Sequence, residues 1–304
     1  MTGRSIRNTM AAMPTAAANG IEICYDTIGD PADPTLLLVN GLGSQLLSWD
    51  PEFCAALADR GFHVVRYDNR DVGLSTHVDA RVDVLGVMRA RAAGEALPPV
   101  PYTLSDMAAD AVGLLDHLGV DRAHVLGASM GGMIAQTIAI EHPDRVITLT
   151  SIMSTTGDPD VGTPTGEALT ALLAPPAQTR GEYQESLVAH AAVWGSPGLY
   201  DTDRLRALGG DAWDRDHDVF GVGRQMAAIS ASGSRSAALA GLAVPTLVIH
   251  GTADTLVQPS GGERTAEVIP GATLLMIEGM GHDLAPPLWP QIIEAVTAHA
   301  AANV

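Results

Sequence analysis

Hydrophobic and polar positions alternate early in the chain and then give way to continuous apolar runs. At residues 21–26 apolar side chains alternate with polar or small ones, which predicts an antiparallel strand with one solvent-facing side. Residues 36–39 read L-L-L-V, a run typical of a strand covered on both faces. Further apolar runs predict strands at 62–67, 124–126, 145–153, 244–250 and 272–277.

Helical segments separate these strands. The clearest begins at Thr103, where Asp106 completes a capping-box pattern, and ends at Gly119. A short amphipathic helix also fits residues 82–91, and we expect it to pack against a neighbouring helical region. The other expected core helices are 51–60, 132–140, 259–269 and 288–300.

The strand–helix rhythm stops after residue 153 and returns at residue 244. Between them, prolines and glycines separate candidate helices at 165–174, 181–194, 202–208 and 221–231. Alternation on both sides of a helical interruption predicts an α/β protein with one parallel sheet and an inserted helical cap. The expected domains are a flexible leader (1–19), a core in two parts (20–153 and 241–304) and the cap (154–240).

The pentapeptide G-A-S-M-G at 127–131 lies between a predicted strand and a predicted helix. This is the nucleophile-elbow pattern, in which a sharp strand-to-helix turn exposes a serine and glycines remove side chains that would collide. The helix N-terminus beneath the serine favours developing negative charge. Ser129 is therefore the candidate nucleophile.

A serine nucleophile needs a base within hydrogen-bond reach and an acid that orients the base. Of the ten histidines, His282 follows the last predicted strand, at the sheet edge where reactive groups gather. Asp254 follows the preceding strand and gives the chain order Ser, Asp, His. Asp158 or Asp160 is a weaker alternative for the acid, and Asp283 is expected to point elsewhere.

Acyl transfer also needs backbone donors for an oxyanion. The N–H of Met130, directly after Ser129, supplies one. The loop N-G-L-G at 40–43 follows a buried strand, and there Leu42 is the best-placed second donor.

Composition narrows the function class. The chain has 304 residues and a formal charge of −18, which argues against nucleic acid as a partner. Cys24 and Cys54 show no metal-ligand spacing, so free thiols in a reducing compartment are expected, with one disulfide as the alternative. With neither a signal-peptide core nor an apolar run of membrane-spanning length, we expect a cytoplasmic protein. No Gly-rich phosphate loop or Cys/His cluster suggests a cofactor, so we expect none and no metal.

The chain resembles the α/β-hydrolase superfamily. The resemblance rests on motifs that follow one another along the chain: 40–43, 66–75, 127–132, Asp254 and the G-M-G-H run at 279–282. Within this superfamily the chain is similar to actinobacterial esterases related to aclacinomycin methylesterase and to lipase-G-type enzymes. The resemblance covers 20–152 and 243–300 and is weak in the cap. It implies an eight-stranded, mostly parallel sheet with helices on both faces, and Asn40 stands where many relatives have His.

The resemblance and the triad imply a serine-dependent carboxylic ester hydrolase acting on small to medium apolar acyl or aryl esters. The alternatives are a C–C bond hydrolase or cofactor-free perhydrolase of the same fold, or a low-turnover ligand-binding protein. The expected partner is a small-molecule ester, with weak lipid contact allowed, and the protein is expected to be a monomer or homodimer. Besides Met130, the candidate pocket residues are Gly41, Gln45, Trp49 and Met153.

Overall fold

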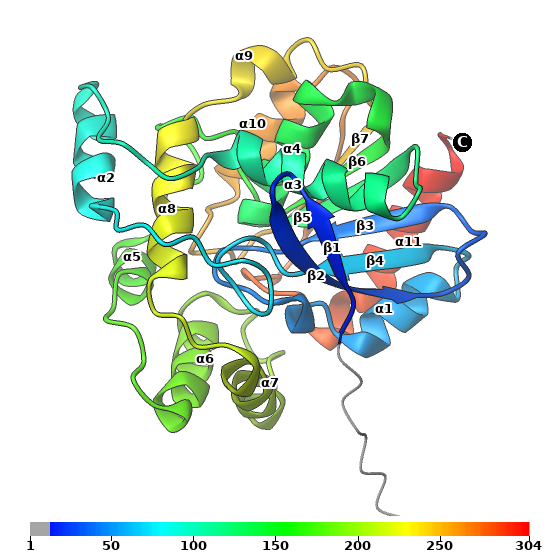
Figure 1. The fold of residues 1–304 in the computed structure, drawn as a ribbon. Coiled ribbons are helices and arrows are strands. Elements are labelled where there is room, and N and C mark those ends of the chain that lie inside the picture. The colour runs from blue at the N-terminus through cyan, green and yellow to red at the C-terminus, as the bar shows by residue number, and fades with distance from the viewer. Residues whose placement is uncertain (1–12, 304) are drawn as a thin grey trace, which may run out of the picture.

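An eight-stranded sheet runs through the computed structural model, which describes residues 13–303 (Figure 1). Its strands are β1 (Thr15–Ala18), β2 (Ile21–Ile28), β3 (Thr35–Val39), β4 (His63–Tyr67), β5 (Ala123–Ala128), β6 (Val146–Ile152), β7 (Thr246–Gly251) and β8 (Thr273–Ile277). Their order is β1-β2-β4-β3-β5-β6-β7-β8. The β1–β2 and β2–β4 pairs are antiparallel and the remaining pairs are parallel. The predicted fold class is confirmed.

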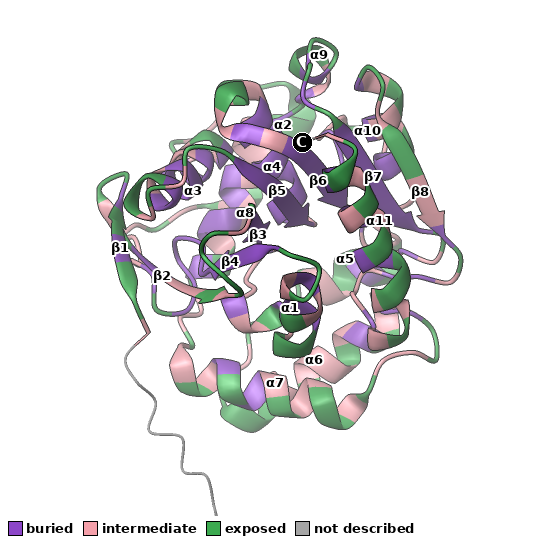
Figure 2. Ribbon diagram, turned by 90° about the vertical axis from the view of Figure 1, so that its right-hand side faces the viewer, coloured by how far each residue is buried: buried purple, intermediate pink, exposed green. Residues whose placement is uncertain are grey.

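Helices cover both faces of this sheet. The core helices are α1 (Pro51–Ala58), α2 (Val84–Ala93), α3 (Leu104–His117), α4 (Met130–Glu141), α10 (Ser260–Val268) and α11 (Trp289–Ala301). Side chains of β3 alternate between the faces: Leu36 and Leu38 pack with α1 and α11, whereas Leu37 and Val39 pack with α3 and α4. Figure 2 shows the resulting buried strands between helices whose outer surfaces are exposed.

The first strand corrects the predicted leader. Residues 1–12 lie outside the described residues, but Thr15–Ala18 forms β1 and pairs with β2. Ala16 and Ala18 are buried and pack on α3, where a Cβ atom on Gly113 would lie 2.9 Å from the Ala18 Cβ. Short alanine side chains give little hydrophobic contrast, so the sequence pattern did not reveal this strand.

The inserted region between β6 and β7 is helical, as predicted. It contains α5 (Gly166–Leu172), α6 (Arg180–Trp194), α7 (Thr202–Arg215), α8 (Gly221–Ser232) and α9 (Ser236–Leu239). Helix α7 continues past the predicted end at residue 208 because Gly209 packs tightly against Gln184 of α6 instead of breaking the helix. Helix α8 packs against α3 and against α2, the predicted amphipathic segment.

Two further observations concern the described residues as a whole. None of their helices has the length and apolar character needed to cross a membrane. Cys24 and Cys54 are both free and buried, which resolves the choice between thiols and a disulfide.

Candidate active site

Ser129 occupies the turn between β5 and α4, the strand–turn–helix context that the pentapeptide predicts. Its backbone has φ 57° and ψ −122°, a conformation that side-chain-bearing residues rarely adopt. The Ser129 N–H donates to the Ile152 carbonyl at 2.9 Å, and the Ser154 hydroxyl donates to the Ser129 carbonyl at 2.8 Å. These bonds hold the strained turn in place.

The glycines on either side of Ser129 are required by close packing. A Cβ atom on Gly127 would lie 2.0 Å from the Gly131 carbonyl oxygen, and one on Gly131 would lie 2.0 Å from the Val39 carbonyl oxygen. No side chain fits at such distances. The first contact closes the turn, and the second brings α4 against the end of β3, which leads into the loop at 40–43.

His282 and Asp254 meet Ser129 at the carboxyl edge of the sheet. His282 Nε2 lies 2.8 Å from the Ser129 hydroxyl, and His282 Nδ1 lies 2.7 Å from an Asp254 carboxylate oxygen. The other Asp254 oxygen accepts from the backbone N–H groups of Leu256 and Val257, both at 2.9 Å. The three residues singled out in the sequence are therefore in direct hydrogen-bond contact.

The partners of His282 determine its neutral tautomer. A carboxylate only accepts, so Nδ1 carries the hydrogen and Nε2 is left to accept the Ser129 proton. Burial of Asp254 tends to raise its pKa, but the opposing effects of His282 and His250 dominate and lower the pKa to about 2. Asp254 is thus ionised at neutral pH.

A second histidine, His250, contacts the same carboxylate. It lies in β7, is fully buried, and its Nε2 is 2.8 Å from the Val257 carbonyl and 3.4 Å from Asp254. Because the Val257 carbonyl only accepts, Nε2 carries the hydrogen. His250 therefore contacts the same Asp254 oxygen as His282 does.

The loop that carries His282 is fastened to the end of α6. The N–H of Gly281 donates to the Ser196 hydroxyl at 2.9 Å, and the Ser196 N–H donates to Asp283 at 3.0 Å. The Ser196 hydroxyl also donates to Asp283, so this carboxylate points away from the Ser129 site as expected. The local sequence gave no signal for Ser196, which lies 85 positions from Gly281.

The loop at 40–43 lies against Ser129. A Cβ atom on Gly41 would be 3.3 Å from the Ser129 Cβ, which places this loop beside the hydroxyl. The Asn40 side chain is buried and donates to the Tyr67 carbonyl at 2.8 Å, so it anchors the loop to the end of β4. No described residue accepts a hydrogen bond from the N–H of Leu42 or of Met130.

The other candidate pocket residues occupy different places. Met153 directly follows β6, has a left-handed φ of 42° and is buried. Trp49 is 2% exposed and stacks on Phe53 in the core. The Gln45 amide donates to the Ala212 and Asp216 carbonyls of the inserted region. Core packing and inter-helix bonding account for Trp49 and Gln45, so we leave both out of the proposed site.

The alternative acids are engaged elsewhere. Asp158 accepts hydrogen bonds from Ser234 and Ser236 and pairs with Arg264 at 3.1 Å. Asp160 pairs with the same guanidinium at 3.2 Å. Neither carboxylate has a recorded contact with His282. Among the residues that the structure describes, no group of three or more His, Cys, Asp or Glu side chains is arranged to hold a metal ion.

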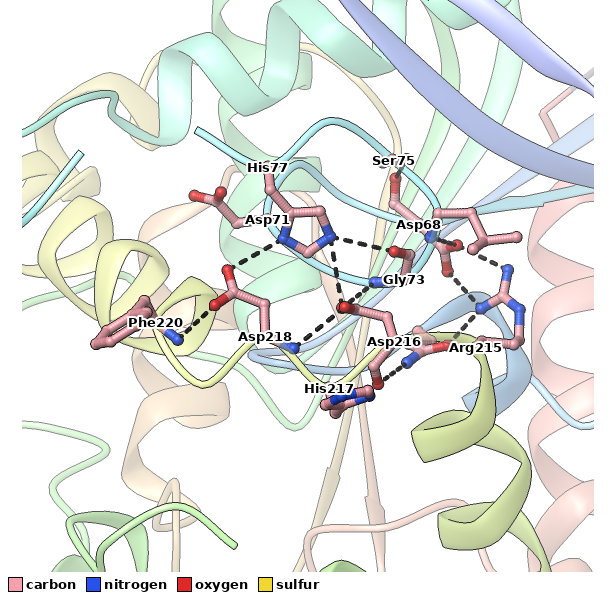
Figure 3. A network of polar contacts seen from close by, with 12 residues as sticks. Asp68, Asp71, Gly73, Ser75, His77, Arg215, Asp216, His217, Asp218 and Phe220 are labelled. Atoms are coloured by element: carbon pink, nitrogen blue, oxygen red, sulfur yellow. Dashed lines mark hydrogen bonds and ion pairs between the residues drawn. The ribbon is translucent and has the colours of Figure 1, made fainter. Parts of the chain in front are cut away.

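A second polar cluster, not foreseen from the sequence, joins residues 68–77 of the core to residues 215–224 of the insertion; we call it the core–cap network. Asp68 pairs with Arg215, and Asp71 pairs with Arg224, each at 2.8 Å and with both side chains almost fully buried. Figure 3 shows His77 between Asp218 and Asp216 in the same network. Asp71 thereby joins the loop after β4 to the inserted region.

Comparison with known proteins agrees with this geometry. A family model described as the alpha/beta hydrolase fold matches residues 34–285. Rhodomycin D methylesterases DauP of Streptomyces sp. (strain C5) and DnrP of Streptomyces peucetius are 31% and 30% identical to the chain, with 95% of this chain and 99% of each relative covered. Both similarities therefore extend over nearly the full length.

A solved structure extends the similarity to three dimensions. The enol-lactonase from Burkholderia xenovorans LB400 is 27% identical to this chain and superposes with a TM-score of 0.73. The match covers 95% of this chain and 100% of the lactonase chain. The sheet order, the strand–Ser–helix turn and the family match lead to one assignment. The chain belongs to the α/β-hydrolase-fold family and is a carboxylesterase-like hydrolase.

Proposed function

We propose that this protein is a serine-dependent carboxylic ester hydrolase with Ser129, His282 and Asp254 as its catalytic triad. The observation that carries the proposal is the pair of hydrogen bonds, 2.8 Å and 2.7 Å, that connects the Ser129 hydroxyl through His282 to Asp254. This geometry lets an imidazole remove the serine proton while a fixed carboxylate stabilises the imidazolium.

The reaction proceeds in two halves. His282 Nε2 takes the Ser129 proton while Oγ attacks the ester carbonyl, and the Leu42 and Met130 N–H groups stabilise the oxyanion. The tetrahedral intermediate collapses, and the alcohol leaves with the proton from His282. Water, deprotonated by His282, then attacks the acyl-enzyme and releases the carboxylic acid and free Ser129.

Small to medium apolar acyl or aryl esters are the proposed substrates. Met130 directly follows Ser129, and Met153 follows Ile152, whose carbonyl accepts from the Ser129 N–H, so two adaptable apolar residues adjoin the turn. Gly41 lies against the nucleophile. Two relatives are named as methylesterases and a third as an enol-lactonase, which favours small alcohol or enol leaving groups within this class.

A panel of chromogenic esters with increasing acyl length tests the proposal. We expect hydrolysis by the wild type and a fall in kcat of about 10⁴-fold or more in Ser129→Ala, because the nucleophile is removed. Mass spectrometry after treatment with an alkyl phosphonate should place the adduct on Ser129. Equal background rates for wild type and Ser129→Ala on every ester would reject the proposal.

A further inference from the structure

Gln225 of α8 is completely buried, yet both atoms of its amide bind backbone groups of the core. The Gly43 N–H donates to Gln225 Oε1 at 2.8 Å, and Gln225 Nε2 donates to the Arg70 carbonyl at 2.8 Å. Because an N–H only donates and a carbonyl only accepts, these partners fix the orientation of the amide. We propose that Gln225 is a positioning residue that holds the oxyanion loop, residues 40–43, against Ser129; this inference rests on the proposed esterase function.

The loop needs such a support because one side of it contacts the nucleophile. Gly41 lies against Ser129, while Gly43 has a φ of 65° and lies against Val222 of α8. Leu42, the proposed oxyanion donor, sits between these two contacts. Among the residues that the structure describes, the bond at Gly43 is the only hydrogen bond from the backbone of residues 41–43 to the inserted region.

The opposite end of the amide is fixed to the core. The Arg70 guanidinium makes two bonds of 2.6 Å to Asp110 of α3, and both side chains are buried. The residue before Gln225, Arg224, makes bonds of 2.9 Å and 2.8 Å to Asp71. Two consecutive residues of α8 thus bind two consecutive residues of the core, which gives Gln225 a rigid base.

A glutamine meets a requirement here that an apolar residue cannot meet. An apolar side chain would remove the partner of the part-buried Gly43 N–H and of the buried Arg70 carbonyl, and burying a polar group without a partner is destabilising. Oxyanion stabilisation depends on donors that are already in place before the reaction. Gln225 therefore makes the position of α8 part of the geometry of the oxyanion site.

Kinetics of two Gln225 variants test this role. Gln225→Met keeps the length of the side chain and removes both hydrogen bonds, and Gln225→Glu keeps the acceptor for Gly43. Gln184→Met is the matched control, because Gln184 also donates from a cap helix to a backbone carbonyl, that of Arg206, but does not touch the oxyanion loop. Each variant is assayed for kcat and KM on p-nitrophenyl acetate, with active sites counted by phosphonate titration.

We expect kcat to fall about 10- to 100-fold in Gln225→Met, less than the loss of a whole oxyanion donor, and to fall less in Gln225→Glu. KM should change little. The inhibition constant of a trifluoromethyl ketone, which adds to the Ser129 hydroxyl and forms an oxyanion, should rise by the same factor as kcat/KM falls. A purely structural role would instead lower the melting temperature and leave kcat per titrated site unchanged.

The outcomes separate this inference from the proposed function. If the wild type does not exceed Ser129→Ala, the esterase function is lost and this role of Gln225 with it. If the wild type is active and Gln225→Met keeps kcat within about twofold, only the positioning role is overturned. If Gln225→Met does not fold, Gln225→Ala, which also removes both hydrogen bonds, decides: an unchanged inhibition constant for the ketone overturns the role, and a raised one, absent in Gln184→Met, supports it.

Discussion

The Ser129 site and the core–cap network both bury carboxylates beside nitrogen-bearing side chains. At the sheet edge, Asp254 contacts His282 and His250; in the network, Asp68 and Asp71 contact Arg215 and Arg224. In all these pairs the carboxylate side chain is fully buried. Burial and pairing of charge therefore do not distinguish a reactive site from a structural one.

The difference lies in what the chain of contacts ends on. In the network, the guanidinium groups and carboxylates bind one another and fixed backbone groups across the junction. At the sheet edge, the contacts end on the partly exposed hydroxyl of Ser129, beside the N–H groups of Leu42 and Met130, for which no described residue is an acceptor. A reactive site is marked by polar groups that the protein leaves ready for a substrate.

The largest effect that separates the two regions should come from Asp254→Asn. The substitution keeps the shape of the side chain but allows the wrong His282 tautomer, so we expect kcat to fall about 10³- to 10⁴-fold. The free energy of unfolding at neutral pH should fall by only about 2 kcal/mol, because Asn lacks the charge of the ionised Asp254 carboxylate. Steady-state kinetics and chemical denaturation measure both quantities. A loss of stability with kcat close to that of wild type would assign Asp254 to the structural class instead.

Breaking the core–cap network should lower stability and leave kcat nearly unchanged. Arg215→Met leaves the buried Asp68 carboxylate without its ion-pair partner, and we expect the free energy of unfolding to fall by about 3–5 kcal/mol. Replacing both partners, in Asp68→Asn/Arg215→Met, should recover part of that loss. Urea denaturation measures the stabilities, and kcat per titrated active site should stay near that of wild type. A large fall in kcat per site would link the network directly to catalysis.

Acid should affect the Ser129 region through Asp254. Its folded pKa of about 2 lies below the ordinary value of 3.8, so its stabilisation is present above the ordinary value and is lost as the pH falls through 2. We expect wild type to lose about 2 kcal/mol more than Asp254→Asn between about pH 5 and about pH 2. Denaturation midpoints at several pH values provide the comparison, and parallel curves for the two proteins would contradict it.

The smallest effect concerns His77. Its ring nitrogens face the Asp218 carboxylate at 3.1 Å and the Gly73 carbonyl at 3.2 Å, and both partners only accept. Burial tends to lower the pKa of His77, but the Gly73 carbonyl and the carboxylates of Asp216 and Asp218 outweigh it and raise the pKa. The stabilisation is therefore present at low pH and is lost as the pH rises through the raised pKa.

We expect His77→Gln to reduce stability by less than about 1 kcal/mol at about pH 5.5, and to have no effect at about pH 9. Thermal melts of both proteins at the two pH values measure the difference. An effect that grows with pH would show that neutral His77 is the stabilising form.

Much of the Ser129 site could be predicted from sequence because each of its parts follows a strand. A buried parallel strand has a recognisable apolar run, and the carboxyl ends of such strands meet at one edge. The residues just after 128, 251 and 277 therefore had to lie near one another, which brought Ser129, Asp254 and His282 into consideration. The glycines of the elbow could also be predicted from sequence, because the close contacts that require them include residues of the same turn.

The contacts across the insertion could only be found in the tertiary structure. Gln225 and Gly43 are 182 positions apart, and no periodic pattern or motif relates them. Arg215 and Asp68 read as ordinary solvent-exposed charges until the fold buries them together. Strand 15–18 was hidden for a related reason, because its burial depends on the match between small alanines and α3.

Sequence by itself thus determined the parallel strands, the elbow and the chain order of Ser129, Asp254 and His282, because these depend on local periodicity and on the geometry common to parallel sheets. The tertiary structure decided how the inserted helices bind the loops at 40–43 and 279–282. Those bonds depend on side chains from distant segments that meet only after the chain has folded, and hydrogen bonding selects them by distance in space rather than by spacing in sequence.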